Sequence, residues 1–288
     1  MYKEREQAEN FAAYLVDQEK SKSTVEKYTR DVRHFLKYVG EKELNHGLVM
    51  QYKEHLSQRY KVSSINSMLI AVNGYLNYIG RGDCCVRNLK VQRQIFREES
   101  KELNKTEYRK LIFEARRKGK KRLAHIIQTL GMTGIRISEL KYITVESLKR
   151  RMVRISNKGK LRIILLPQPL VTLLTRYCRS INLKNGSIFV TRTGQPVDRK
   201  NVWAEMKKLC LWAGVEESKV FPHNLRHLFA RCYYEKEKDL VRLADFLGHS
   251  SIETTRRYTM ISTMEACLKE LERGLMVGEE KREARMNM

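Results

Sequence analysis

The chain has 288 residues, which predicts two domains at roughly 100–200 residues per domain and excludes a mini-protein. It carries 57 lysines and arginines against 33 aspartates and glutamates, and this net charge of +24 points to a polyanionic partner, with DNA or RNA as the first candidate. Hydrophobic residues make up 42% of the chain, so ordinary cores can form, and the composition argues against a basic disordered tail protein.

Membrane and metal signals are weak in this sequence. No apolar run approaches the roughly 18 residues that cross a bilayer, and the charged segment 1–10 lacks the apolar core of a signal peptide. The six cysteines form no Cys-x-x-Cys pair, so we predict free thiols in a reducing cytoplasm and expect no metal and no cofactor.

Residues 1–90 are predicted to form a domain of helices, because apolar residues recur there every three or four positions. A capping box from Ser23 to Glu26 is expected to open the clearest helix, and Ser63 or Ser64 to cap the last one. The four helices are expected around residues 11–15, 23–39, 48–56 and 63–79. Residues 91–104 show no sustained period and are predicted to be a linker.

Residues 105–275 are predicted to form a second, mainly helical domain with a small antiparallel sheet, followed by a tail over 276–288. Two β-rich runs, 152–156 and 161–166, flank a turn and predict a hairpin, and 187–191 is a candidate third strand. Residues 101–288 hold 40 basic against 20 acidic residues, whereas residues 1–100 hold 17 against 13. The second domain is therefore expected to attract an anion more strongly.

The basic run 116–122 has two interpretations. It is either a solvated turn or a patch that contacts phosphates, because like charges packed this closely repel one another unless something neutralises them.

Four short motifs in the second domain carry chemistry. Arg136 follows a glycine-bearing break and is expected to open a helix, where a guanidinium fork and backbone N–H donors suit a phosphate. Glu139, three residues later, is interpreted as a carboxylate that braces this site. Lys158 lies at the hairpin tip, where a lysine can enter a DNA groove and meet a leaving oxygen.

The other two motifs lie further along the chain. His223 and Arg226 share one face of a helix that Pro222 opens, which suits a phosphoryl group with proton transfer nearby, and His227 is expected to be a buried support. His249 follows Gly248 in a turn, and Tyr258 lies nine residues later.

Taken together, Arg136, Lys158, His223-x-x-Arg226, Gly248-His249 and Tyr258 occur in an order that resembles the tyrosine recombinase (phage integrase) family. The resemblance covers essentially the whole chain, is most specific over 223–258, and the overall size is similar to that of the Xer-type members. It implies an N-terminal SAM-like core-binding domain and a mixed α/β catalytic domain. The family hairpin often reads Gly-Lys-Gly-x-x-Lys, and the sequence here leaves Lys160 as an alternative to Lys158.

The resemblance also implies a role for each residue. Tyr258 would attack a DNA phosphate to form a 3′-phosphotyrosine without ATP, while Arg136 and Arg226 stabilise the growing charge. Lys158 would protonate the leaving 5′-oxygen, and His223 would accept or relay the tyrosine proton. His249 would bind the phosphate.

The implied partner is double-stranded DNA with paired inverted-repeat sites. A homotetramer, with one dimer on each of two sites and with accessory proteins as candidates, would act in the cytoplasm at the nucleoid, with no membrane. The apolar stripe over 261–275 would either pack on its own domain or dock on a neighbouring protomer. Integration, excision, inversion and dimer resolution stay open as the biological task. The rival functions are a type IB topoisomerase and a non-catalytic DNA-binding protein.

Overall fold

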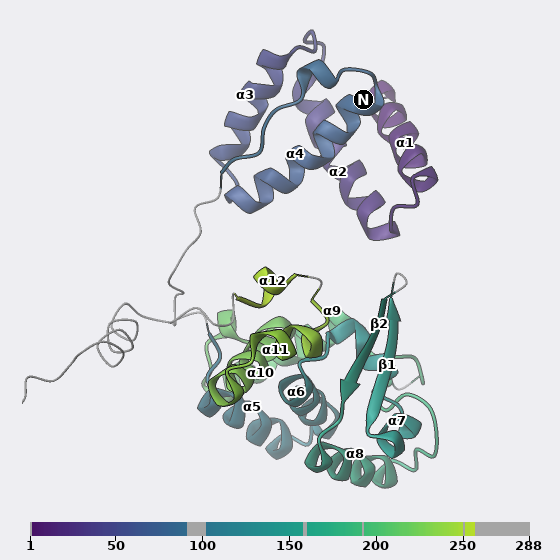
Figure 1. Cartoon of the computed structure of the whole chain (residues 1–288), viewed down its shortest axis with the longest axis vertical. Helices are drawn as coiled ribbons and strands as arrows, with labels where there is room; N and C mark the ends of the chain where they lie inside the picture. The colour runs from purple at the N-terminus through teal and green to yellow at the C-terminus, as the bar shows by residue number, and fades with distance from the viewer. Residues whose placement is uncertain (1, 91–101, 158–159, 192, 250, 257–288) are drawn as a thin grey trace, which may run out of the picture. The chain divides into compact units, whose positions relative to one another are not determined.

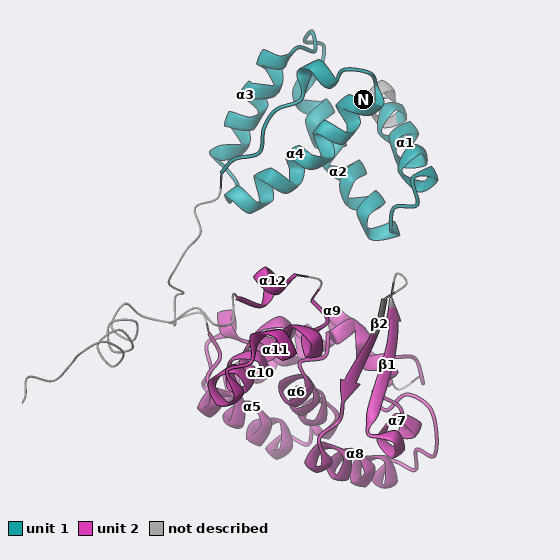
Figure 2. Cartoon of the chain, in the orientation of Figure 1, with its two compact units in different colours: residues 1–93 teal, residues 94–288 magenta. Residues whose placement is uncertain are grey.

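The computed structural model describes residues 2–90, 102–157, 160–191, 193–249 and 251–256. The chain divides into two compact units, residues 1–93 and residues 94–288 (Figure 2). The predicted tail, the apolar stripe over 261–275 and most of the predicted linker lie outside the described residues. Within the described residues, no helix combines the length and the apolar character needed to cross a bilayer.

The first unit is helical, as predicted (Figure 1). Its buried core gathers apolar side chains from all four α-helices, among them Phe11, Phe35, Tyr52 and Leu76, each fully or almost fully buried. The elements are α1 (Tyr2–Asp17), α2 (Lys22–Val39), α3 (His46–Ser57), α4 (Val62–Tyr78) and the short 3₁₀ helix η1 (Gly82–Cys84).

Both predicted N-caps in this unit are wrong. Helix α2 begins at Lys22, and its N-cap is Ser21, whose hydroxyl accepts a hydrogen bond from the backbone N–H of Thr24 at 3.3 Å. Ser23 already lies in the first helical turn. Helix α4 likewise begins before Ser63, after Lys61, without any side-chain cap. An N-cap needs a short side-chain acceptor in extended backbone just before the helix. Where several serines lie close together, the sequence does not show which of them takes that position.

The second unit is mainly helical with one two-stranded antiparallel sheet, as predicted. Helix α6 lies at its centre, where Leu123, Ile126 and Leu130 are fully buried, and α10 packs against it. The elements are α5 (Lys105–Arg117), α6 (Lys121–Thr133), η3 (Ile137–Tyr142), α7 (Val145–Arg150), β1 (Met152–Asn157), β2 (Lys160–Leu165), α8 (Gln168–Ser180), α9 (Arg199–Ala213), η4 (Glu217–Lys219), α10 (Pro222–Glu237), α11 (Leu240–Leu247) and α12 (Ile252–Arg256).

The hairpin of β1 and β2 has one face in the core and one face in solvent. Its register pairs Val153 with Ile164 and Ile155 with Arg162. Val153, Ile155 and Ile164 are each 2% exposed, whereas Ile163 is 44% exposed. Because cross-strand partners share a face, Arg162 lies on the core face beside three apolar side chains.

The predicted third strand does not form. Residues 187–191 make two isolated antiparallel bridges, Thr144 with Ser187 and Val190 with Pro196. The Val190–Pro196 bridge is made by hydrogen bonds from Thr191 N–H to the carbonyl of Gln195 and from Val197 N–H to the carbonyl of Phe189, and neither bridge extends into a ladder.

The basic run 116–122 is divided between two helices. Arg122, in α6, donates to the carbonyl of Val190 and to Glu205, each within 2.9 Å. Lys118 and Lys120, in the turn between α5 and α6, lie 5.0 and 5.6 Å from the ring centroid of Trp212. These three cations therefore have partners within the protein itself.

Glycines bring the elements that carry the motifs close together. Gly134 ends α6 with φ +60°, and a Cβ there would lie 2.5 Å from a ring carbon of Phe229 in α10. Only glycine tolerates both the left-handed backbone and this approach. The chain leaving α6 is thus held against α10, and Arg136 comes two residues later.

Candidate active site

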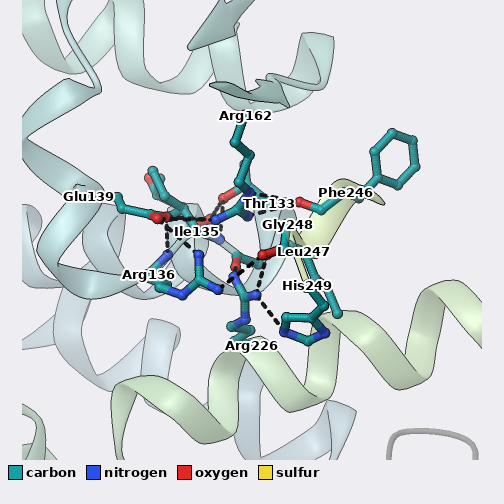
Figure 3. Close-up of polar contacts among 12 residues, drawn as sticks. Thr133, Ile135, Arg136, Glu139, Arg162, Arg226, Phe246, Leu247, Gly248 and His249 are labelled. Atoms are coloured by element: carbon teal, nitrogen blue, oxygen red, sulfur yellow. Dashed lines mark hydrogen bonds and ion pairs between the residues drawn. The ribbon is translucent and has the colours of Figure 1, made fainter. Parts of the chain in front are cut away.

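Residues far apart in the sequence meet at one point of the second unit (Figure 3). The start of η3 supplies Arg136 and Glu139, strand β2 supplies Arg162, helix α10 supplies Arg226, and the turn after α11 supplies His249. Arg136 and Arg162 both pair with Glu139, Arg226 contacts His249, and the backbone carbonyls of residues 246–248 join the two groups.

Arg136 is the exposed cation of this group. Its Nη1 lies 3.1 Å from Oε1 of Glu139, and its backbone N–H donates to Oε2 of the same carboxylate at 2.9 Å. Glu139 is only 8% exposed, whereas the Arg136 side chain is 42% exposed. A buried carboxylate therefore orients a guanidinium that remains accessible to an anion from solvent.

Arg226 is the buried cation, with 2% of its surface exposed. Its Nη1 donates to the carbonyl of Gly134 and its Nη2 to the carbonyl of Leu247, which ties the ends of α6 and α11 to α10. The same Nη2 lies 3.0 Å from Nε2 of His249. Because the Arg226 guanidinium is planar and makes all three contacts at once, its orientation is fixed before any ligand binds.

The contacts of His249 determine which of its ring nitrogens carries the proton. Arginine has no acceptor, so Nε2 must accept from Arg226, and Nδ1 must donate to Oγ1 of Thr255, 2.9 Å away. Burial, followed by the charges of Arg226, Arg136 and Arg162, lowers the pKa of His249 to about 4. The imidazole is therefore neutral near pH 7, and the positive charge of the site resides on the arginines.

This pKa predicts a pH-dependent stability. The histidine pKa is about 6.5 in an unfolded chain, so between that value and about 4 the unfolded state binds more protons than the folded state. The contribution of His249 to stability is complete above pH 6.5 and is lost as the pH falls towards 4. We expect urea unfolding of His249→Gln to depend less on pH than the wild type across this window. Parallel pH dependences of the two proteins would contradict the assignment.

His223 and His227 stack at the start of α10. Their ring centroids lie 4.5 Å apart at an interplanar angle of 79°, an edge-to-face contact between residues four apart on one helix. His223 is exposed, and His227 is 8% exposed. His227 is thus buried, as expected, whereas the reactive role expected of His223 stays a prediction. His223 also disfavours the charged form of His249 by electrostatic repulsion, which lowers the pKa of His249 further.

Arg162 is a residue of this site that no sequence motif indicated. It is 9% exposed, lies 2.9 Å from Oε2 of Glu139, and donates Nε and Nη2 to the carbonyl of Phe246 at 3.2 and 2.8 Å. The alternation of the hairpin was the available signal, because Arg162 and Ile164 are two residues apart and must face the same side.

Two predicted site residues, Lys158 and Tyr258, lie outside the described residues. The backbone of Lys160, the alternative lysine, pairs with Asn157 at the end of the hairpin. In the described part of the chain, no group of three or more histidine, cysteine or acidic side chains is arranged to hold a metal ion.

Comparisons with known proteins agree on one family. Residues 101–265 match the profile of the phage integrase family, and residues 8–81 match the phage integrase N-terminal SAM-like domain. Tyrosine recombinase XerA of Pyrococcus furiosus is 32% identical over 263 residues, which cover 88% of this chain and 89% of that protein.

Solved structures share the fold. The post-cleavage complex of the XerH site-specific recombinase with a palindromic difH substrate aligns with a TM-score of 0.67 at 20% identity, over 86% of this chain and 79% of that one. A lambda integrase dimer bound to a core site aligns with a TM-score of 0.71 at 14% identity, over 90% of this chain and 95% of that one.

Proposed function

Because the chain belongs to the phage integrase family and is a tyrosine recombinase that acts on DNA, we propose that Tyr258 cleaves one DNA strand through a 3′-phosphotyrosyl intermediate. The phenolic oxygen forms a bond to the scissile phosphorus while the bond to the 5′-oxygen breaks. His223 takes the phenol proton, and Lys158 gives a proton to the departing oxygen. A 5′-hydroxyl from the partner strand then reverses the step and joins new ends, so the phosphodiester energy is conserved and no ATP is needed.

The observation that carries this proposal is the convergence of the exposed Arg136, the buried Arg226 and a neutral His249 at one point of the second unit. In the transition state, negative charge grows on the non-bridging oxygens of the phosphate, and two fixed guanidinium groups can stabilise it. His249 is uncharged and its Nε2 accepts from Arg226, so it orients that guanidinium rather than adding a third cation. A protein that only bound DNA would gain nothing from a buried, pre-oriented arginine, because exposed cations suffice for phosphate contacts.

Strand exchange tests the function directly. Two duplexes with different fluorescent labels, each carrying the paired sites, are mixed with the protein, and products that carry both labels are counted after deproteinisation. The sites are first identified by denaturing protein–DNA mixtures with SDS and sequencing the DNA that stays attached. A type IB topoisomerase would relax supercoiled DNA and yield no doubly labelled product. A non-catalytic binding protein would yield neither attached DNA nor exchange.

Lys158 is expected to act as the general acid, and Lys158→Met should slow cleavage by about 10²–10⁴-fold. A substrate with sulfur at the 5′-bridging position should restore most of that rate, because a thiol with a pKa near 8.5 leaves without being protonated. Lys160→Met is the matched comparison, since the two lysines are two residues apart in the sequence. Sulfur rescue of Lys160→Met alone would move the role to Lys160.

We assign DNA core-binding to residues 1–90 and catalysis to residues 105–275. We further propose paired inverted repeats as the target and a tetramer, one dimer per site, as the active assembly in the cytoplasm. The crystallised lambda integrase dimer on a core site and the palindromic substrate of XerH support this arrangement. Sedimentation of the protein with two site-bearing duplexes should give one complex that holds both. Complexes limited to one duplex would argue for a different assembly.

A further inference from the structure

We propose that Arg162 is a positioning residue for strand cleavage, which fixes the turn that carries His249 relative to Arg136 without touching the phosphate. This inference rests on the proposed function, since it assigns Arg162 to the same site. Arg162 belongs to none of the four sequence motifs, and it lies buried on the core face of β2 rather than with the exposed Arg136.

Burial is the first observation behind the proposal. Arg162 shares its face of the hairpin with Ile155 and Ile164, at a position where an apolar residue would satisfy the packing. A guanidinium in such a place must be paired and hydrogen-bonded to offset the loss of water. The side chain meets this demand through Glu139 on one side and the carbonyl of Phe246 on the other.

The second observation is a pattern at the end of α11. Three consecutive carbonyls, of Phe246, Leu247 and Gly248, each accept from a different arginine (Figure 3). The donors are Arg162, Arg226 and Arg136, in that order, from three different elements. The last carbonyls of a helix lack partners within the helix and carry its negative dipole end, so they attract cations. The C-terminal end of α11 therefore fixes the positions of the three guanidinium groups relative to one another.

Gly248 provides independent support. A Cβ at this position would lie 2.3 Å from Cδ and 2.8 Å from Nε of Arg162, closer than any neighbour tolerates. The stem of Arg162 thus crosses directly over the backbone that leads into His249. Its position and that of the turn cannot change separately.

Glu139 links this support to the exposed arginine. Its carboxylate receives Arg162 at 2.9 Å and Arg136 at 3.1 Å, so the two guanidinium groups share one negative charge. Without Arg162, Glu139 would pair with Arg136 alone, and the Arg136 guanidinium would no longer be held in its present orientation. The carbonyl of Phe246 would also lose its donor, and the turn before His249 would loosen.

The test compares Arg162→Met with Arg154→Met, which removes the same charge from the exposed face of the same hairpin. Single-turnover cleavage is measured at saturating protein on a nicked substrate that traps the adduct, and Kd is measured separately. We expect Arg162→Met to cleave about 10²-fold more slowly, the order of effect that small misplacements of reacting groups produce. Its Kd should stay within about twofold of the wild type, as expected when no phosphate contact is lost. Arg154→Met should cleave at the wild-type rate once bound.

A second readout does not depend on catalysis. Arg162 is one of the charges that lower the pKa of His249, so the pKa measured by NMR in the free protein should rise in Arg162→Met. An unchanged pKa or wild-type cleavage by Arg162→Met would overturn the proposal. If Arg162→Met does not fold, Arg162→Lys takes its place, because a single ammonium cannot bridge Glu139 and the carbonyl of Phe246 as the guanidinium does. Wild-type cleavage by Arg162→Lys would equally overturn the proposal. If the wild type forms no adduct, the proposed function fails, and the His249 pKa still decides the positioning role.

Discussion

Replacing Tyr258 by phenylalanine is expected to abolish the covalent protein–DNA adduct and strand exchange while leaving DNA affinity within about twofold of the wild type. The change removes one oxygen atom, which is the only atom of the side chain that bonds to phosphorus in the proposed reaction. The ring stays, so the substitution is close to isosteric. Affinity rests on many phosphate contacts elsewhere in a chain of net charge +24.

The measurement is a denaturing gel of end-labelled DNA, in which an adduct migrates with the protein. A suitable control is Tyr234→Phe, because Tyr234 lies in α10 of the same unit and loses the same hydroxyl. The control should form adduct at the wild-type rate. An adduct that persists in Tyr258→Phe would show that another of the 14 tyrosines, or a different residue type, is the nucleophile.

The phenol also needs help from its surroundings. An ordinary tyrosine pKa is about 10, so almost no phenolate exists at neutral pH. In the proposed reaction this help comes from His223, which takes up the phenol proton as the bond to phosphorus forms.

Arg226→Lys is the second change with a very large expected effect, a loss of about 10²–10³-fold in the single-turnover cleavage rate, by analogy with the loss of one oxyanion donor. Arg226 reaches the carbonyls of Gly134 and Leu247 and Nε2 of His249 with one planar group. A lysine keeps the charge but supplies a single point of donation on a flexible stem, so it cannot hold these partners and a phosphate oxygen in one geometry.

Lysine is preferred to alanine here because Arg226 is 2% exposed. Alanine would leave two buried carbonyls without donors, at about 1–3 kcal/mol each, and the loss of folding would obscure the catalytic effect. Arg136→Lys is the matched comparison, since that side chain is 42% exposed and a lysine there faces no comparable burial. A cleavage rate for Arg226→Lys within about threefold of the wild type would contradict the clamping role assigned to Arg226.

The elements themselves were largely readable from the sequence. Apolar residues at helical spacing predicted four helices in the first unit, and two β-rich runs around a glycine turn predicted the hairpin. These features depend on local periodicity and turn chemistry, which neighbouring residues specify. The wrong predictions were also local ones. They concerned the N-caps at Ser23 and Ser63 and the strand over 187–191. In each case the folded chain determined which hydrogen-bond acceptor or which partner segment was available.

The order of the motifs was enough to propose the reaction, since Arg136, His223, Arg226, His249 and Tyr258 are recognisable as residue types in sequence. Only the tertiary structure decided how the motif residues in its described part contact one another. The arginine–carbonyl contacts around α11 join residues 21, 84 and 112 positions apart, and no periodicity indicates which buried faces meet. The neutral state of His249 and the buried place of Arg162 follow from that meeting, because desolvation and neighbouring charges act through space and not along the chain.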